Sequence, residues 1–300
     1  MIREFDEIIE GAKNKGPKTI SVAVAQDQEV LSAIKAAKDL GIANAIFVGD
    51  KKAIIKEALD INMDLSKFEI VDEKDKVEAC KKAVSLISEG KAHILMKGLV
   101  DTSIILKAIL DEKAGLRTGN VLSHVAVFDV DGYDRLFYIT DAAMNIAPNL
   151  EQKKQILQNV VRVAHALGNP EPKVALLAAV EKVNPKMQAT LDAEALVNMN
   201  KTGEITGCLL GGPFALDNAI SLEAAKHKGI NHPVAGKADI LMVPVIEAGN
   251  MLYKSMVYFA RAKNAGILVG AKVPVVLTSR ADSDIAKLNS IAIGVLMASC

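Results

Sequence analysis

The chain of 300 residues is predicted to be an α/β protein with two domains built on parallel sheets. Three observations support this fold class. Short apolar segments alternate with amphipathic helical patterns along the chain. Half of the residues are hydrophobic but only 4% are aromatic, a composition typical of helices packed on parallel sheets. The heptapeptide GKAHILM at 90–96 nearly recurs as GKADILM at 236–242, which indicates two related halves.

The first part of the chain reads as repeated strand–helix units. Apolar runs predict strands, and each is followed by a segment with apolar residues at helical spacing. Such units imply right-handed crossovers and a parallel sheet. The predicted strands are TISVAVA at 19–25, AIFVGD at 45–50, FEIVD at 68–72 and HILMK at 93–97.

The rhythm changes after residue 117. Two apolar runs flank Asp131–Gly132, which is a strong hairpin signal. The pattern then predicts helices at 151–167, 191–200 and 216–228, strands at 173–180, 207–212, 238–244, 266–271 and 273–279, and a last helix from 284. We expect a discontinuous first domain of residues 1–117 plus 273–300 and a second domain of residues 118–272, because the last strand and helix then return to the first sheet.

Composition excludes several function classes. Acidic and basic side chains balance at 36 each, so net charge provides no attraction to nucleic acid or to an anionic membrane. Cys80, Cys208 and Cys300 are too far apart for a disulfide framework or a metal-spaced cluster, which favours reduced thiols. The amino terminus lacks a signal-peptide core, and the apolar runs are too short to span a bilayer. We therefore expect a cytoplasmic protein without nucleic-acid or membrane partners.

Several catalytic motifs are absent. The sequence contains no GxGxxG, GxxxxGK[ST], GxSxG, HExxH or CxxC. These absences argue against a dinucleotide oxidoreductase, a P-loop kinase, a serine hydrolase and a zinc enzyme. No metal site is expected.

The first candidate site is the turn after the last predicted strand, at 278–283. Arg280 offers a planar fork of donors that matches phosphate, and Ser279 adds a hydroxyl. Asp282 or Ser283 has the alternative role of capping the last helix. The alternative for Arg280 is an ion pair.

A second candidate follows the strand at 93–97. Gly98 permits close approach of the backbone, Lys97 supplies a positive charge, and Thr102 or Ser103 begins a helix. Backbone N–H groups at such a strand-to-helix corner suit an anionic ligand. A helix cap beside a solvated lysine is the alternative explanation.

The remaining candidates lie in the second part of the chain. Asn250 and Lys254 are four residues apart, so one helix face presents both side chains to a polar ligand; a cap plus an exposed helix face is the alternative. Asp141 and Asn145 follow the strand RLFYITD, where caps and Asx-turns are the alternatives. His124 sits in an apolar strand, and its alternative role is that of a buried, hydrogen-bonded histidine.

With these residues assembled, the chain resembles the phosphate acetyltransferase and butyryltransferase family over almost its entire length. The segments that carry the resemblance are MKGLVDTS, LRTG with SHVAVF, ITDAAMN, VNPKM, GPFALD, VAGKADI, EAGNMLYK and TSRADS. LRTG…SHVAVF and SRADS are nearer to the butyryl branch of the family than to the acetyl branch.

The resemblance implies a reaction and an architecture. Family members interconvert acyl-CoA plus phosphate and acyl phosphate plus CoA, with acyl-CoA as a substrate, no metal and no permanently bound cofactor. Their fold is two doubly wound, three-layer α/β domains with a cleft between them, as in isocitrate and isopropylmalate dehydrogenases. The resemblance implies that Ser279 and Arg280 bind the phosphoryl group, with the loop at 97–103 facing them. Arg117 of LRTG is a further substrate-binding candidate, and a homo-oligomer, a dimer or larger, is expected.

One position departs from the family pattern. Acetyl-type members carry an aspartate, thought to act as the general base, seven residues after the serine; this chain has Ala286 there. Asp282 and His124 are the substitutes that we consider for the base. Because a thiol titrates near ~8.5, a modest positive field suffices to form the thiolate. We expect direct attack in a ternary complex, without an acyl-enzyme on Cys208 or Cys300.

Two other functions stay open at this stage. One is a non-catalytic acyl-CoA or acyl-phosphate sensor on the same scaffold, which the missing aspartate favours. The other is a nicotinamide-dependent decarboxylating dehydrogenase of related fold. The dehydrogenase would need an aspartate cluster for a divalent metal and a dinucleotide-binding segment, and the sequence offers neither.

Overall fold

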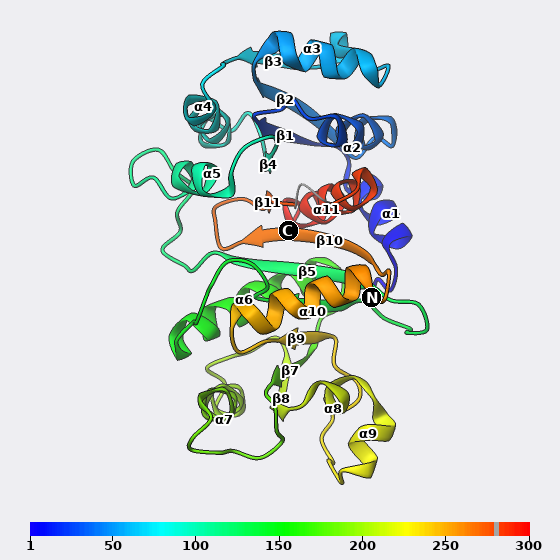
Figure 1. The fold of residues 1–300 in the computed structure, drawn as a ribbon, viewed down its shortest axis with the longest axis vertical. Helices are drawn as coiled ribbons and strands as arrows, with labels where there is room; N and C mark the ends of the chain where they lie inside the picture. The colour runs from blue at the N-terminus through cyan, green and yellow to red at the C-terminus, as the bar shows by residue number, and fades with distance from the viewer. Residues whose placement is uncertain (279–281) are drawn as a thin grey trace. The chain divides into compact units, whose positions relative to one another are not determined.

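The computed structural model describes residues 1–278 and 282–300 and contains two compact units (Figure 1). The first unit comprises Phe5–Asn120 and Ala265–Cys300, and the second comprises Met1–Glu4 and Val121–Asn264. The chain therefore passes between the units at 4/5, 120/121 and 264/265. The domain boundaries expected from the sequence, at 117/118 and 272/273, stay a prediction. The boundary at 272/273 lies eight residues after the change of unit at 264/265.

The first unit is built on a sheet with the strand order β3-β2-β1-β4-β11-β10. Every paired neighbour is parallel except β10 and β11, which are antiparallel, so the predicted parallel sheet is confirmed. Its elements are α1 (Phe5–Lys15), β1 (Lys18–Ala23), α2 (Gln28–Asp39), β2 (Ala43–Gly49), α3 (Lys51–Asp60), η1 (Leu65–Lys67), β3 (Glu69–Asp72), α4 (Lys76–Ser88), β4 (Ile94–Lys97), α5 (Thr102–Ile109), β10 (Lys263–Val269), β11 (Val275–Val276) and α11 (Asp284–Met297).

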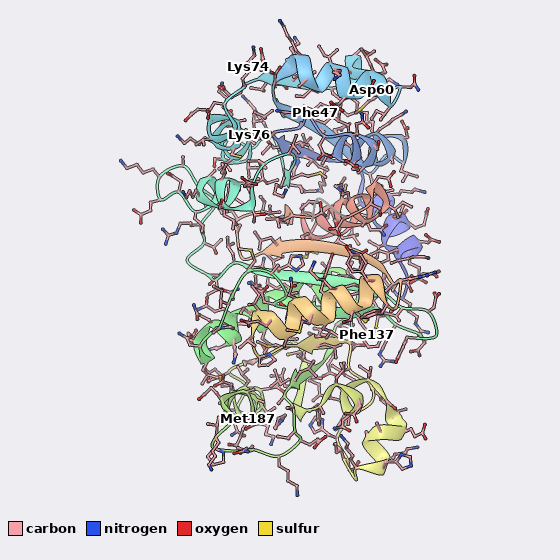
Figure 2. All side chains as sticks on the ribbon, viewed as in Figure 1. Phe47, Asp60, Lys74, Lys76, Phe137 and Met187 are labelled. Carbon is pink, nitrogen blue, oxygen red and sulfur yellow. The ribbon has the colours of Figure 1, made fainter. Side chains whose placement is uncertain are left out.

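Helices cover both faces of this sheet. Helix α11 packs against α1 and α2 on one face, while α4 and α5 pack together on the other, which gives three layers (Figure 1). The helices begin where short polar side chains cap them: Asp27, Asp50 and Asp75 each accept a hydrogen bond from the first turn. Phe47 lies in the interior, whereas Asp60 and Lys74 are at the surface (Figure 2).

The second unit has the strand order β5-β6-β9-β7-β8. The predicted hairpin is confirmed, because β5 and β6 are antiparallel, and the other neighbours are parallel. Its elements are β5 (Ser123–Asp129), β6 (Phe137–Thr140), α6 (Leu150–Ala166), β7 (Lys173–Leu177), α7 (Gln188–Lys201), β8 (Leu209–Phe214), α8 (Leu216–Ile220), α9 (Leu222–His227), β9 (Ile240–Met242) and α10 (Ile246–Tyr258).

The single helix predicted at 216–228 is wrong. Ser221 is extended, with φ −114° and ψ 117°, and its hydroxyl accepts a hydrogen bond from the backbone N–H of Ala224. A serine that caps a new helix competes with continuation of the old one. The segment therefore forms two short helices.

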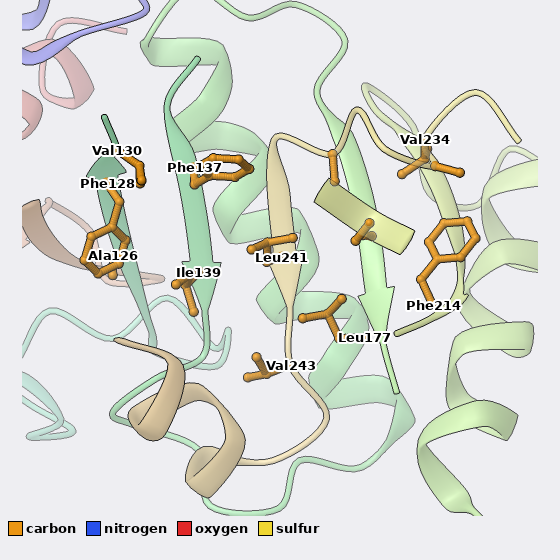
Figure 3. Close-up of a cluster of buried hydrophobic side chains, with 14 of the residues drawn as sticks. Ala126, Phe128, Val130, Phe137, Ile139, Leu177, Phe214, Val234, Leu241 and Val243 are labelled. Atoms are coloured by element: carbon orange, nitrogen blue, oxygen red, sulfur yellow. The ribbon is translucent and has the colours of Figure 1, made fainter. Parts of the chain in front are cut away.

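The core of the second unit lies on one face of its sheet. Phe128, Phe137, Ile139 and Leu241 project to the same side and form one buried cluster (Figure 3). Residues of α8 and α9 belong to this cluster and partly buried side chains of α10 pack against it, whereas none of the buried residues of α6 belongs to it. Helix α6, which packs on β5 and β6, therefore covers the opposite face.

The two copies of the near-repeat have the same structure. His93, just before β4, accepts a hydrogen bond at Nδ1 from the N–H of Thr19, and its own N–H donates to the Thr19 carbonyl. Asp239, just before β9, does the same with Lys173: Oδ2 accepts from the Lys173 N–H, and the Asp239 N–H donates to the Lys173 carbonyl. Each copy thus fixes the register of a central strand against its neighbour.

Within residues 1–278 and 282–300, none of the helices combines the length and apolar character needed to cross a bilayer.

Candidate functional site

The first-unit corner lies at the carboxyl ends of two adjacent strands. Val276 of β11 pairs with Met96 of β4, so continuing the parallel register brings Thr278 beside Gly98. Ser279 and Arg280, the predicted phosphoryl-binding pair, lie outside the described residues. Ligands of open α/β sheets bind at the carboxyl ends of the strands, so this edge suits an anionic substrate.

Lys97 is buried at the end of β4. Its Nζ donates to the carbonyl oxygens of Gly98 and Val100, both at 3.2 Å. Main-chain oxygens thereby compensate part of the cost of burying the ammonium group. Burial raises the pKa of the nearby Cys80 thiol to about 11, and the charge of Lys97 offsets part of that rise.

Gly98 is required by the path of the backbone itself. A Cβ at this position would lie 2.2 Å from the Val24 carbonyl oxygen and 2.8 Å from that of Ala23. The N–H groups of Gly98 and Leu99 donate to these two carbonyls at 2.8 Å. Val24 has a φ of 58°, which a β-branched residue rarely adopts. The close approach expected at Gly98 is therefore made by the end of β1.

The loop from Lys97 leads directly into α5. Asp101 is its N-cap residue, and Thr102 and Ser103 are its first residues, half-buried and exposed respectively. The first N–H groups of a helix have no intrahelical partners, so they add donors to the corner. Lys97, Gly98, Thr102 and Ser103 are thus brought together.

Arg117 lies elsewhere in the same unit. Its guanidinium Nη1 is 3.4 Å from Glu112 Oε1, and its side chain is half exposed. The adjacent Thr118 hydroxyl donates to the carbonyl of Gly270, in the turn that precedes β11. Arg117 therefore lies near the start of β11. Because β11 runs parallel to β4, that start is at the opposite edge of the sheet from Lys97, which ends β4, so the structure does not bring Arg117 to the Lys97 corner.

Asp282 and Ser283 lead into α11. Ser283 caps the helix by accepting from the Ala286 N–H at 3.2 Å, so the capping role falls to Ser283. The Asp282 carbonyl accepts a hydrogen bond from Lys287 Nζ, and Lys287 is buried. Ala286, where the family aspartate would stand, is buried as well.

In the second unit, Asp141 organises the carboxyl end of β6. Its Oδ1 accepts from the N–H groups of Ala143 and Met144 at 2.9 and 3.0 Å, and its Oδ2 accepts from Asn145 Nδ2 at 2.5 Å. The same Asn145 amide donates to the Leu122 carbonyl at 2.8 Å, which ties the turn to the start of β5. The predicted Asx-turn is present, and it brings Asp141 and Asn145 into contact.

Helix α10 packs on this turn through Gly249. A Cβ there would lie 2.5 Å from the Asp141 carbonyl oxygen, so only glycine permits the contact. Asn250 Nδ2 donates to the Ala142 carbonyl at 3.4 Å, and Lys254 is exposed one turn further on. Asn250 therefore joins the Asp141 turn, and Lys254 stands next to it on the helix.

His124 belongs to the same group of residues. It lies at the start of β5, which runs antiparallel to β6, and the Thr140 hydroxyl donates to its carbonyl at 2.9 Å. The His124 ring is buried and makes an edge contact with the Tyr253 ring, with centroids 6.2 Å apart. Thr140 is not among the site residues predicted from the sequence. Its place at the end of a strand, directly before Asp141, is the sequence feature that could have indicated it.

The structure also bears on the thiols and on metal binding. Burial raises the pKa of Cys208 to about 12, so this thiol stays protonated near neutral pH. Across residues 1–278 and 282–300, no group of three or more His, Cys, Asp and Glu side chains is placed to hold a metal ion.

Comparison with known sequences identifies the family. The profile described as phosphate acetyl/butaryl transferase matches residues 4–81 and 74–295. The chain belongs to this family. It is 53% identical over 298 residues to the phosphate butyryltransferase of Clostridium beijerinckii, an alignment that covers 99% of both chains.

Solved structures agree with this assignment. A branched-chain phosphotransacylase from Enterococcus faecalis matches with a TM-score of 0.84 and 36% identity, over 94% of this chain and 99% of that one. A 4-hydroxythreonine-4-phosphate dehydrogenase from Klebsiella pneumoniae matches with a TM-score of 0.55 and 13% identity over 94% and 99% of the chains. At that identity the likeness shows the fold alone, and it confirms the dehydrogenase-like α/β architecture.

We predict that Gly98→Ala destabilises the first unit. The new methyl group meets two rigid carbonyl oxygens, and overpacking of this kind costs roughly 1–3 kcal/mol. The free energy of unfolding from urea denaturation measures the effect. Gly294→Ala is the matched control: its nearest neighbour would be at 3.4 Å, within a helix, so it should be neutral or stabilising. Equal stability of both variants would contradict the tight approach at Gly98.

We also predict that Asn145→Asp destabilises the Asp141 turn. The substitution keeps the shape but places a carboxylate against both the Asp141 carboxylate and the Leu122 carbonyl. A loss of roughly 1–3 kcal/mol follows, measured by thermal unfolding at neutral pH. Because protonation removes the repulsion, the loss should shrink as pH falls toward ~4. Asn198→Asp on the exposed side of α7 should change little, and a pH-independent loss at Asn145 would refute the account.

Proposed function

We propose that this protein transfers a short-chain acyl group, butyryl by preference, between coenzyme A and phosphate: acyl-CoA + phosphate = acyl phosphate + CoA. The observation that carries the proposal is the 53% identity to a phosphate butyryltransferase over almost the whole of both chains. The Lys97 corner supports it, because a buried lysine and a helix N-terminus suit a phosphate.

In this proposal the phosphate binds at the carboxyl edge of the first sheet. Lys97 supplies positive charge, Gly98 sets the path of the loop, and the first N–H groups of α5 at Thr102 and Ser103 donate hydrogen bonds. Ser279 and Arg280 follow the adjacent strand and complete the phosphate site. A fixed arginine fork stabilises both the bound anion and the charge that develops in the transition state.

The second-unit residues and Arg117 contact acyl-CoA in this proposal. Asp141 and Asn145 are held in one rigid turn, and Asn250 bonds to it, so polar groups are presented at fixed positions. Lys254 and Arg117 are exposed cations that attract the phosphates of coenzyme A. His124 or Asp282 handles the thiol proton.

The reaction is a direct displacement. A phosphate oxygen attacks the thioester carbonyl carbon, the C–O bond forms, and the C–S bond breaks with its electron pair leaving on sulfur. The CoA thiolate then takes a proton, or stays ionised in a positive field. Each well-placed donor to the developing charge contributes on the order of ~3 kcal/mol. The raised thiol pKa values of Cys80 and Cys208 disfavour either as a competing nucleophile.

A homo-oligomer and a cytoplasmic location are part of the proposal. Helix α10 carries the exposed apolar side chains of Met251 and Tyr258, and Phe259, directly after it, is 89% exposed. Large apolar side chains that gather at the surface are typical of contact surfaces between protein chains. A second copy of the chain is the partner that we propose for this surface.

The test is release of free thiol from acyl-CoA with and without phosphate, across chains from C2 to C8. We expect release that depends on phosphate and is fastest with butyryl-CoA. A maximum at acetyl-CoA would keep the reaction and overturn the butyryl preference. Binding of acyl-CoA without release for any chain would favour the sensor.

Two arginine variants make this assay specific. Arg280→Ala should lower kcat by roughly 10²–10³-fold, the usual cost of removing one donor to a developing charge. Arg162→Ala removes an exposed arginine from α6 and should leave kcat unchanged. Equal activity of the two variants would remove Arg280 from the proposed site.

A further inference from the structure

Lys287 is a buried lysine in an unfavourable place. It is 3% exposed, and it lies in the first turn of α11. Burial penalises an ammonium group, because the group loses its hydration. The positive end of the helix dipole at the start of α11 disfavours a cation as well. The folded chain therefore holds this charge at a cost in stability.

The contacts of Lys287 compensate little of that cost. Its Nζ donates to the main-chain carbonyl of Asp282, and no carboxylate in the part of the chain that the structure describes forms an ion pair with it. Lys153, a lysine of the second unit that is 6% exposed, differs in this respect, because it pairs with Asp192 at 2.5 Å. The charge of Lys153 is neutralised within the fold, whereas that of Lys287 is available to an anion.

Gly294 shows where α11 crosses the first sheet. A Cβ at this position would be in van der Waals contact with Ile94 of β4, at 3.4 Å, and with Val276 of β11, at 3.5 Å. The helix therefore packs over these two neighbouring strands. Side chains on the same face of α11 as Gly294 are directed at β4 and β11.

Ser290, one turn before Gly294, shows the direction in which α11 runs. Its hydroxyl accepts a hydrogen bond from the backbone N–H of Gly266 in β10 at 2.9 Å. Strand β10 is antiparallel to β11, and extending their register places Gly266 opposite Leu277, directly after the end of β11. Moving back along α11 toward its start therefore means moving toward the carboxyl ends of β11 and β4.

Lys287 lies almost one turn further in that direction. It precedes Gly294 by seven residues, close to two full turns, so both lie on the helix face that is directed at the strands. Lys287 is thus level with the edge of the sheet where β4 ends in Lys97. Side chains alternate along a strand, and Ile94 is directed at α11, so Lys97 is directed at the opposite face, which α4 and α5 cover (Figure 1).

We propose that Lys287 is a second cation of the phosphate site, reaching the carboxyl edge of the first sheet from the face opposite Lys97. This inference rests on the proposed function. A phosphate group carries a charge of roughly −1.5 to −2 near neutral pH, so two ammonium groups match it in charge. The hydrogen bond to the Asp282 carbonyl fixes the position of the Lys287 ammonium group at this edge.

A lysine that is kept for binding and one that is kept for stability respond to substitution in opposite ways. Replacing a buried charge that has no ionic partner in the fold by an apolar side chain of similar shape removes a cost, so stability stays the same or rises. Removing one partner of a buried ion pair leaves the other partner's charge uncompensated, so stability falls. Lys287 and Lys153 provide this comparison within one chain.

The test is calorimetric titration of inorganic phosphate into the protein with CoA present, a mixture that contains no acyl group and cannot react. Lys287→Met removes the charge and keeps the length of the side chain. Lys287→Gln also removes the charge but keeps a donor for the Asp282 carbonyl. Lys153→Met is the matched control, because it removes a comparably buried lysine from the second unit.

We expect both Lys287 variants to bind phosphate roughly tenfold more weakly or worse, since a contact between charged groups is worth that much. Their Tm should be unchanged or raised. In the thiol-release assay, KM for phosphate should rise by a similar factor while KM for butyryl-CoA stays the same. Lys153→Met should bind phosphate like the unmodified protein and should have a lower Tm, because Asp192 is left buried without its partner.

Unchanged phosphate affinity in Lys287→Gln would overturn the inference, since the hydrogen bond rather than the charge would then be what matters. Loss of folding in both Lys287 variants would make the residue structural and would also contradict it. The same holds if the unmodified protein binds no phosphate. Because the titration needs no turnover, it separates this inference from the proposed function: phosphate binding that depends on Lys287, without thiol release from any acyl-CoA, would retain the binding site and refute acyl transfer.

Discussion

The structure depends on how the central strand of each unit is held in register. A side chain just before β4 or β9, His93 or Asp239, accepts a hydrogen bond from the neighbouring strand while the backbone of the same residue donates to it. In a strand, a slip of one residue moves every side chain to the opposite face. This pairing therefore decides which residue each strand delivers to the carboxyl edge of its sheet, where the corner begins.

The same register contact precedes chemically different residues in the two units. At the end of β4 this register places Lys97, whose ammonium group donates to two carbonyl oxygens, and Gly98, which packs against the carbonyls at the end of β1. At the end of β9 the same register places Val243, which borders an apolar cavity. The two corners thus share one way of fixing the strand and differ in the side chains that follow it.

Sequence patterns predicted the order of elements, the parallel first sheet and the hairpin at Asp131–Gly132, because these features depend on local periodicity and turn chemistry. They failed at residues 216–228, where the apolar spacing continues but Ser221 caps a new helix. The resemblance identified the corner residues but not the placement of Arg117, which is determined by pairing with the turn after β10. The contact of Gly98 with Val24 and the cavity at Val243 arise from residues distant in sequence, so no local pattern reveals them.

The central claim is that phosphate attacks the thioester directly, with no acyl group held on the protein. Isotope exchange tests it: labelled CoA is incubated with butyryl-CoA and the protein in the absence of phosphate. A ternary-complex mechanism predicts no label in butyryl-CoA until phosphate is added. Label that appears without phosphate, at a rate comparable to turnover, would demonstrate an acyl-enzyme and contradict the account.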